Sequence, residues 1–118
     1  MSSRKYARTA CAAALAALSF GVQAQISGGS VKIGVLTDLS GTYSDLAGSG
    51  AVLATRMAID DFIANEKPSF KIEVVTADHQ NKADIASNKA REWIERENVD
   101  TVTELVTTST ALAVMKVA

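Results

Sequence analysis

The chain has 118 residues, of which 47% are hydrophobic and 21% charged, and its formal net charge is −1. This length suits one compact domain at most, because a domain usually takes roughly 100–200 residues. The near-neutral charge gives no sign of the clustered basic face that nucleic-acid binding requires, and no run reaches the ~18 apolar residues of a membrane span.

The first 24 residues have the three parts of a secretory signal peptide. A basic start within residues 4–8 precedes an apolar, alanine-rich run over residues 9–22, and Val22-Gln23-Ala24 fits the small-residue pattern before a cleavage point. We expect cleavage after Ala24, which leaves a polar leader over residues 25–30. The alternative interpretation of residues 1–24 is a buried N-terminal helix.

The rest of the chain predicts strands that alternate with helices. The predicted elements are a strand over 31–37, a helix over 51–65, a strand over 70–77, a helix over 83–98, a strand over 100–106 and a helix over 107–118. Phe62 and Ile63 fall on the apolar stripe of the first helix, and Trp93 falls on the packing stripe of the second. The last helix has no stop signal before residue 118, which favours a truncated chain.

This alternation is typical of an α/β fold with a parallel sheet. Charges at Lys71 and Glu73 favour an edge position for the second strand, so we predict the strand order 2-1-3 with the first strand in the middle. The chain then reverses direction between the first and third strands, and ligands bind in the crevice at such a switch point. The loops over residues 37–50 and 106–109 meet there.

Hydroxyl side chains gather at the start of the last predicted helix, in Thr107-Thr108-Ser109-Thr110. A helix N-terminus presents unpaired N–H groups and a partial positive charge, and therefore binds carboxylates and phosphates. An ordinary helix cap explains the same residues, since Ser and Thr are common there. Tyr43 in the first loop has two open interpretations, a ligand contact or local packing.

Other functional signals are weak. Gly48-Ser49-Gly50 begins a dinucleotide-binding fingerprint, but Leu53 stands where the third glycine belongs. His79 is the only histidine and makes a poor metal site, so we expect a solvated loop residue there. Glu104 lies in the third predicted strand without an assigned partner. We therefore expect no catalytic residue, no metal site and no cofactor.

Two segments resemble the branched-chain amino acid class of ABC-transporter substrate-binding proteins, which have the type I periplasmic binding fold. The first runs from Val31 to Tyr43, and the second is Ile72-Glu73-Val74-Val75 followed by Ala77-Asp78-His79-Gln80-Asn81-Lys82-Ala83-Asp84. The resemblance covers residues 30–118. It implies that residues 31–118 are the N-terminal part of the first lobe of a two-lobed clamp, and we expect residues 25–118 alone to be at best loosely folded.

In that class the clamp captures a small solute in the periplasm and delivers it to an ABC permease in the inner membrane. The resemblance implies that Thr107, Thr108 and Ser109 hold the solute's carboxylate, and that the aromatic position of the first loop falls on Tyr43 or Leu46. The implied solute is an amino acid, an amide or an aromatic acid, bound by a monomer without catalysis.

Three alternatives remain open beside the transport role. The first is a ligand-sensing receptor domain of the same fold, and the second is a half-domain with no activity of its own. The third is a fragment of a secreted α/β enzyme, which would need a G-x-S-x-G elbow that this sequence does not contain.

Overall fold

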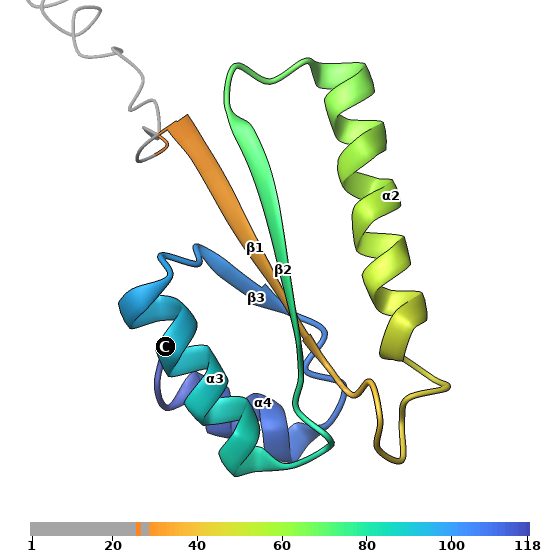
Figure 1. Cartoon of the computed structure of the whole chain (residues 1–118), viewed down its shortest axis with the longest axis vertical. Helices are drawn as coiled ribbons and strands as arrows, with labels where there is room; N and C mark the ends of the chain where they lie inside the picture. The colour runs from red at the N-terminus through yellow and green to blue at the C-terminus, as the bar shows by residue number, and fades with distance from the viewer. Residues whose placement is uncertain (1–25, 27–28) are drawn as a thin grey trace, which may run out of the picture.

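The computed structural model describes Ile26 and residues 29–118 (Figure 1). The predicted signal peptide over residues 1–24 lies outside this part of the chain. The elements are β1 (Ser30–Thr37), α2 (Gly48–Glu66), β2 (Lys71–Asp78), α3 (Ala83–Arg96), β3 (Thr101–Thr103) and α4 (Thr108–Met115). None of the helices in the described residues is long and apolar enough to cross a membrane.

The three strands form a parallel sheet in the order β2-β1-β3, as predicted. β1 pairs with β2 along its whole length, from Ser30 opposite Lys71 to Thr37 opposite Asp78. The pairing of β1 with β3 is much shorter, from Ile33 to Val35. Helix α2 lies on one side of the sheet, while α3 and α4 lie on the other (Figure 1). This arrangement confirms the α/β class and the central place of the first strand.

The main core lies between the sheet and the helices α3 and α4. Leu36 is fully buried there against Ala86, Ala90 and Trp93 of α3, and Val99 and Val114 complete the cluster. The alanines let α3 approach the sheet closely. The absence of a side chain at Gly34 also allows this close approach, because a Cβ atom at this position would lie 2.5 Å from Cζ3 of Trp93. The prediction that Trp93 is a core residue is confirmed.

The opposite face of the sheet is covered less completely by α2. Val52 and Ile59 are half-buried, but Phe62 and Ile63 are 40% and 43% exposed. Phe62 and Ile63, which fall on the predicted apolar stripe, are therefore covered only in part. A hollow of about 230 Å³, lined in part by Ile59 and Ile63 of the helix and by Ile72 and Val74 of β2, lies along this part of the helix. Phe62 instead faces Phe70, with ring centroids 6.5 Å apart.

The third strand is shorter than predicted and ends at Thr103. The next residue, Glu104, has a φ of +68°, a left-handed conformation that cannot continue a strand. Glu104 is exposed and lies outside the sheet, so it needs no partner within the sheet. The remaining boundaries agree with the predictions within about four residues.

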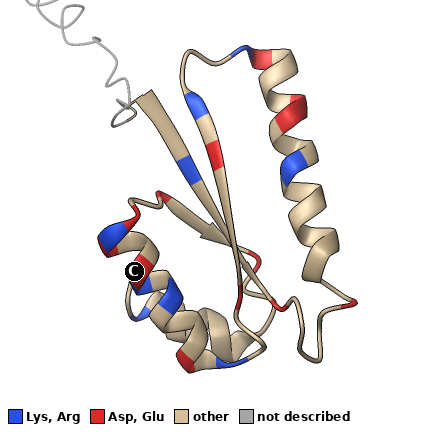
Figure 2. Cartoon of the chain, viewed as in Figure 1, with Lys and Arg blue, Asp and Glu red and all other residues tan. Residues whose placement is uncertain are grey.

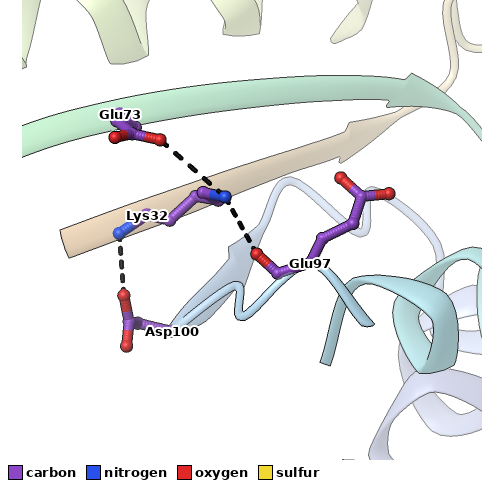
Figure 3. A network of polar contacts seen from close by, with 4 residues as sticks. All are labelled: Lys32, Glu73, Glu97 and Asp100. Carbon is purple, nitrogen blue, oxygen red and sulfur yellow. Dashed lines mark hydrogen bonds and ion pairs between the residues drawn. The ribbon is translucent and has the colours of Figure 1, made fainter. Parts of the chain in front are cut away.

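Charged residues of both signs lie on β2, α2 and α3, whereas β1 carries only Lys32 and α4 carries no charged residue (Figure 2). One group of them joins the amino end of the sheet to the end of α3 (Figure 3). Lys32 Nζ donates to the Glu97 carbonyl at 2.9 Å and lies 3.8 Å from Glu73 Oε2. The Lys32 amide donates to Asp100 Oδ2 at 2.7 Å, while the Asp100 amide donates to the Lys32 carbonyl at 2.9 Å. These contacts extend the pairing of β1 before β3 begins.

Candidate functional site

Three loops follow the three strands, and in a parallel sheet they meet at the same edge. These loops are residues 38–47 after β1, residues 79–82 after β2 and residues 104–107 after β3. β1 lies between its two neighbours, so the loops after β1 and β3 flank the predicted switch point. The predicted site residues all lie in these loops or in the first turn of α4.

Asp78 at the end of β2 ties the first two loops together. Its Oδ1 accepts hydrogen bonds from the amides of Leu39 at 2.9 Å and Gln80 at 2.8 Å, and its Oδ2 accepts one from Ser40 Oγ at 2.6 Å. Burial opposes the charged form, yet these hydrogen bonds and the nearby His79 hold the pKa of Asp78 below its usual value. The charged carboxylate of Asp78 therefore links the loop after β1 to the loop after β2.

Asp38 folds the first loop in the same way. It is fully buried, and its carboxylate accepts hydrogen bonds from the amides of Gly41 at 2.6 Å and Tyr43 at 2.9 Å. A side chain at position 41 would meet this carboxylate, because a Cβ atom there would lie 2.5 Å from Asp38 Oδ1. Tyr43 and Leu46 belong to the next turn, where the Leu46 amide donates to the Tyr43 carbonyl at 3.0 Å.

Both candidates for the aromatic position remain accessible at this edge. Tyr43 is 37% exposed and Leu46 is 77% exposed. Among the described residues, no hydrogen bond joins the side chain of Tyr43 or Leu46 to any of the hydroxyl side chains at the start of α4. The structure therefore places Tyr43 and Leu46 together in one turn, and Thr107, Thr108 and Ser109 together in another segment.

The loop after β2 is a tight turn from His79 to Lys82. The Lys82 amide donates to the His79 carbonyl at 2.8 Å, and the two central residues, Gln80 and Asn81, have φ values of 53° and 54°. These features define a type I′ turn, in which asparagine is favoured. The turn brings the side chain of Asn81 toward the third loop.

His79 is fully buried, so the expectation of a solvated loop residue is wrong. Its Nδ1 accepts a hydrogen bond from the Asn81 amide at 2.9 Å, which places the ring proton on Nε2. Nε2 has no hydrogen-bond partner among the described residues. Burial lowers the pKa of His79, although the negative charges of Asp38 and Asp78 oppose this shift. The ring is therefore neutral at pH 7.

The first turn of α4 presents the predicted hydroxyl groups. Thr107 is the N-cap residue, and its carbonyl accepts the first helical hydrogen bond, from the Ala111 amide at 3.0 Å. The amides of residues 108–110 precede that bond and have no partner within the helix. Thr108 and Ser109 are exposed, whereas Thr110 is fully buried and donates to the Leu105 carbonyl at 2.7 Å.

Sequence reasoning missed Asn81 as a residue of this site. Thr107 Oγ1 donates to Asn81 Oδ1 at 3.0 Å, a contact between the second and third loops. The available signal was the position of Asn81 in a polar turn directly after a strand, since such turns meet at one edge of a parallel sheet.

A hollow of about 580 Å³ lies at the opposite edge of the sheet, lined in part by Ser30 and Lys32 at the amino end of β1.

The sequence profile of the periplasmic binding proteins matches residues 30–118. A solved periplasmic binding protein from Burkholderia mallei is 46% identical, with a TM-score of 0.69 over 78% of this chain and 24% of that chain. No curated protein sequence matches the chain significantly.

Two further solved structures have the same fold. The branched-chain amino acid transporter substrate-binding protein LivJ from Streptococcus pneumoniae, solved with isoleucine, is 22% identical, with a TM-score of 0.66 over 75% of this chain and 26% of that chain. An ABC-transporter solute-binding protein from R. palustris, solved with 4-hydroxybenzoate, is 28% identical. Its TM-score is 0.58 over 74% of this chain and 23% of that chain.

The chain thus spans about a quarter of the length of each of these three structures. Its three-stranded parallel sheet is consistent with a type I periplasmic binding fold. Because the family profile covers most of the sequence, the chain belongs to the periplasmic binding protein family.

Proposed function

We propose that this protein is the extracytoplasmic solute-binding component of an ABC importer, which captures a small carboxylate or amide solute and delivers it to an inner-membrane permease. Residues 31–118 form the first part of one lobe of a two-lobed clamp. The observation that carries the proposal is the first turn of α4 at the switch point of the sheet, where Thr108 and Ser109 are exposed and the first amides have no partner within the helix.

This turn suits a carboxylate for two physical reasons. Amides at a helix N-terminus carry a partial positive charge, and the hydroxyl groups of Thr108 and Ser109 add donors without adding a formal charge. The acidic side chains nearby, Asp38 and Asp78, each accept hydrogen bonds from the loops. Both oxygens of each carboxylate therefore already accept a hydrogen bond from the loops, which limits their competition with a bound carboxylate for donors.

Tyr43 and Leu46 would supply apolar surface from the loop after β1, at the same end of the sheet as these donors. A solute-binding pocket is mostly apolar, with a few polar groups that fix orientation. Both residues keep exposed area in the first loop. We assign them to the contact with the non-polar part of the solute or with the second lobe when the clamp closes.

The solute class is supported by what two relatives bind. The Streptococcus pneumoniae protein was solved with isoleucine and the R. palustris protein with 4-hydroxybenzoate, and both solutes carry a carboxylate. A branched-chain amino acid or an aromatic acid is therefore our first choice. We further propose that residues 1–24 direct export to the periplasm, and that the protein acts as a monomer without catalysis, metal or cofactor.

Calorimetric titration tests this proposal on the protein expressed from its complete gene. We expect L-isoleucine, 4-hydroxybenzoate or acetamide to bind, and Ser109→Ala to weaken binding of a carboxylate solute about tenfold. Ser87→Ala is the matched control, because Ser87 bonds only the Asp84 carbonyl on α3 and should leave affinity unchanged. The proposal is wrong if none of the three solutes binds, or if Ser109→Ala binds as tightly as the wild type.

A further inference from the structure

The turn over residues 79–82 is joined to the loop after β1 through one carboxylate. The Gln80 amide donates to Asp78 Oδ1 at 2.8 Å. The same carboxylate accepts from the Leu39 amide and from Ser40 Oγ, which belong to the loop after β1. The position of the turn is therefore coupled to the position of that loop.

On its other side, the turn contacts the start of α4. Asn81 Oδ1 accepts a hydrogen bond at 3.0 Å from Oγ1 of Thr107, the N-cap residue of α4. The same Thr107 oxygen lies 3.0 Å from Thr110 Oγ1 and 3.2 Å from Ser109 Oγ. A displacement of the turn would therefore reach the hydroxyl groups of the candidate site as well as the loop after β1.

The ring of His79 holds this turn closed from the protein interior. The ring is fully buried, and its Nδ1 accepts a hydrogen bond from the Asn81 amide at 2.9 Å. The His79 amide donates to the Thr37 carbonyl at 2.9 Å, which fixes the start of the turn against β1. Nε2 has no hydrogen-bond partner among the described residues. The closed turn thus needs the neutral ring, with Nδ1 as an acceptor.

Protonation of the ring is incompatible with the closed turn. An imidazolium donates at both nitrogens, so its Nδ1–H would face the Asn81 amide and the hydrogen bond between them would be lost. The new positive charge would also be buried, which is unfavourable for an ion that is not well paired. A protonated His79 therefore requires the turn to open and admit water to the ring.

The charged groups around the ring do not remove this conflict. Asp38 in the loop after β1 and Asp78 on β2 favour the charged ring, but burial outweighs them and the pKa of His79 is lowered. Both carboxylates already accept hydrogen bonds from backbone amides. α4 carries no charged residue. The charged residues at the start of α3 and in the loop after β3 are exposed, and they are Lys82, Asp84 and Glu104.

We infer that His79 is a positioning residue of the solute site, whose neutral ring holds the turn after β2 in contact with both flanking loops, so that protonation of His79 opposes solute binding. This inference rests on the proposed function and adds a dependence on pH to it. His79 is fully buried and acts through the turn, not through contact with the solute. By linkage, the solute must in turn disfavour protonation of the ring to the same extent.

The direction of the effect follows from the neutral ring. The solute binds the protein with the turn closed, whereas the open turn takes up a proton as the pH drops below the ordinary value of 6.5. Solute affinity should therefore be constant above pH 6.5 and should fall below it. Because one titrating group changes an affinity at most about tenfold per pH unit, we expect a fall of about fivefold between pH 7.5 and pH 5.

Calorimetric titrations at pH 5, 6 and 7.5 test this dependence on the protein expressed from its complete gene. The probes are L-isoleucine, 4-hydroxybenzoate and acetamide, and each solute that binds is compared between the wild type and His79→Asn. This substitution keeps an acceptor for the Asn81 amide but does not titrate. The ratio of wild-type to variant affinity cancels the titration of the solute itself, and should fall about fivefold from pH 7.5 to pH 5.

Gln80→Gly is the matched control, because it alters the same turn at a residue with a left-handed backbone and leaves the ring of His79 in place. It should keep the pH dependence of the wild type. A second measurement needs no variant. The pKa of His79, followed by NMR from its ring resonances, should be lower in the presence of saturating solute than in its absence.

The outcomes separate this inference from the proposed function. If the wild type binds none of the three solutes at pH 7.5, both are overturned. If a solute binds but the affinity ratio is the same at pH 5 and pH 7.5, or the solute leaves the pKa of His79 unchanged, the role of His79 is wrong while the proposed function stands. Circular dichroism at each pH verifies that the protein stays folded, so that a loss of global structure is not mistaken for the effect.

Discussion

Asp78 Oδ2 accepts a hydrogen bond from Ser40 Oγ at 2.6 Å, which joins the end of β2 to the loop that follows β1. The same carboxylate accepts two backbone amides, one from each loop. One side chain thus fixes the relative positions of two of the three loops at the candidate site.

Asp78→Asn should therefore destabilise the protein by roughly 1–2 kcal/mol, because the neutral amide is a weaker acceptor and one of its ends can no longer accept. Urea denaturation followed by circular dichroism measures this difference in the free energy of unfolding. Asp61→Asn on the exposed face of α2 is the control and should change stability little. Equal stability of both variants would show that Asp78 does not hold the loops.

The contact between Gly34 and Trp93 predicts a large effect from one methyl group. Gly34→Ala places a Cβ atom 2.5 Å from the Trp93 ring, and the resulting overpacking should cost about 1–3 kcal/mol. Gly50→Ala on α2 is the contrast, because nothing lies within 4 Å of its added Cβ atom. This second substitution should stabilise by about 0.5–1 kcal/mol. Thermal unfolding of the two variants should shift in opposite directions.

His79 predicts a dependence of stability on pH. The pKa of the folded state is below the ordinary value of 6.5, so the folded protein binds fewer protons than the unfolded chain at mildly acidic pH. Stability should therefore be constant with respect to this group above pH 6.5 and should fall as the pH drops below it. Asp78, whose pKa is also lowered, contributes a second loss of stability, below its ordinary value of 3.8.

His79→Asn separates these two contributions, because its side-chain oxygen can accept from the Asn81 amide as Nδ1 does. Urea midpoints measured between pH 4.5 and 8 should decline less steeply in this variant than in the wild type. An identical slope would mean that protonation of His79 does not oppose folding.

The contacts of Lys32 predict unequal contributions from its two partners (Figure 3). Its Nζ donates at 2.9 Å to the carbonyl of Glu97, the C-cap residue of α3, whereas the carboxylate of Glu73 is 3.8 Å away and half-exposed. Lys32→Met should cost about 1 kcal/mol, and Glu73→Gln at most about 0.5 kcal/mol. Denaturation at low and high salt measures both. A larger loss from Glu73→Gln would show that the ion pair dominates.

Periodicity and turn signals predicted the strand order and the core position of Trp93, because both follow from side-chain patterns within single elements. They did not predict the end of β3 at Thr103, since the left-handed conformation of Glu104 is unusual for glutamate. They predicted the apolar stripe to which Phe62 and Ile63 belong, but not that both side chains stay partly exposed. Helical spacing shows which residues share a face, but not how closely that face approaches its neighbour.

The same limit applies to the candidate site. The switch-point rule located the loops and the start of α4 from sequence alone. The burial of His79 and the contact between Asn81 and Thr107 depend on how two loops pack together. A polar turn gives no signal in sequence that distinguishes an inward-facing histidine from a solvated one.

The central claim is that a solute binds at the first turn of α4. The most direct measurement is an amide chemical-shift titration by NMR on the protein expressed from its complete gene, with L-isoleucine and 4-hydroxybenzoate as the added solutes. The account predicts that, among residues 29–118, the amides of Thr108, Ser109 and Thr110 shift most. Largest shifts at Asn98 and Val99, beside the hollow at the opposite edge of the sheet, would contradict it.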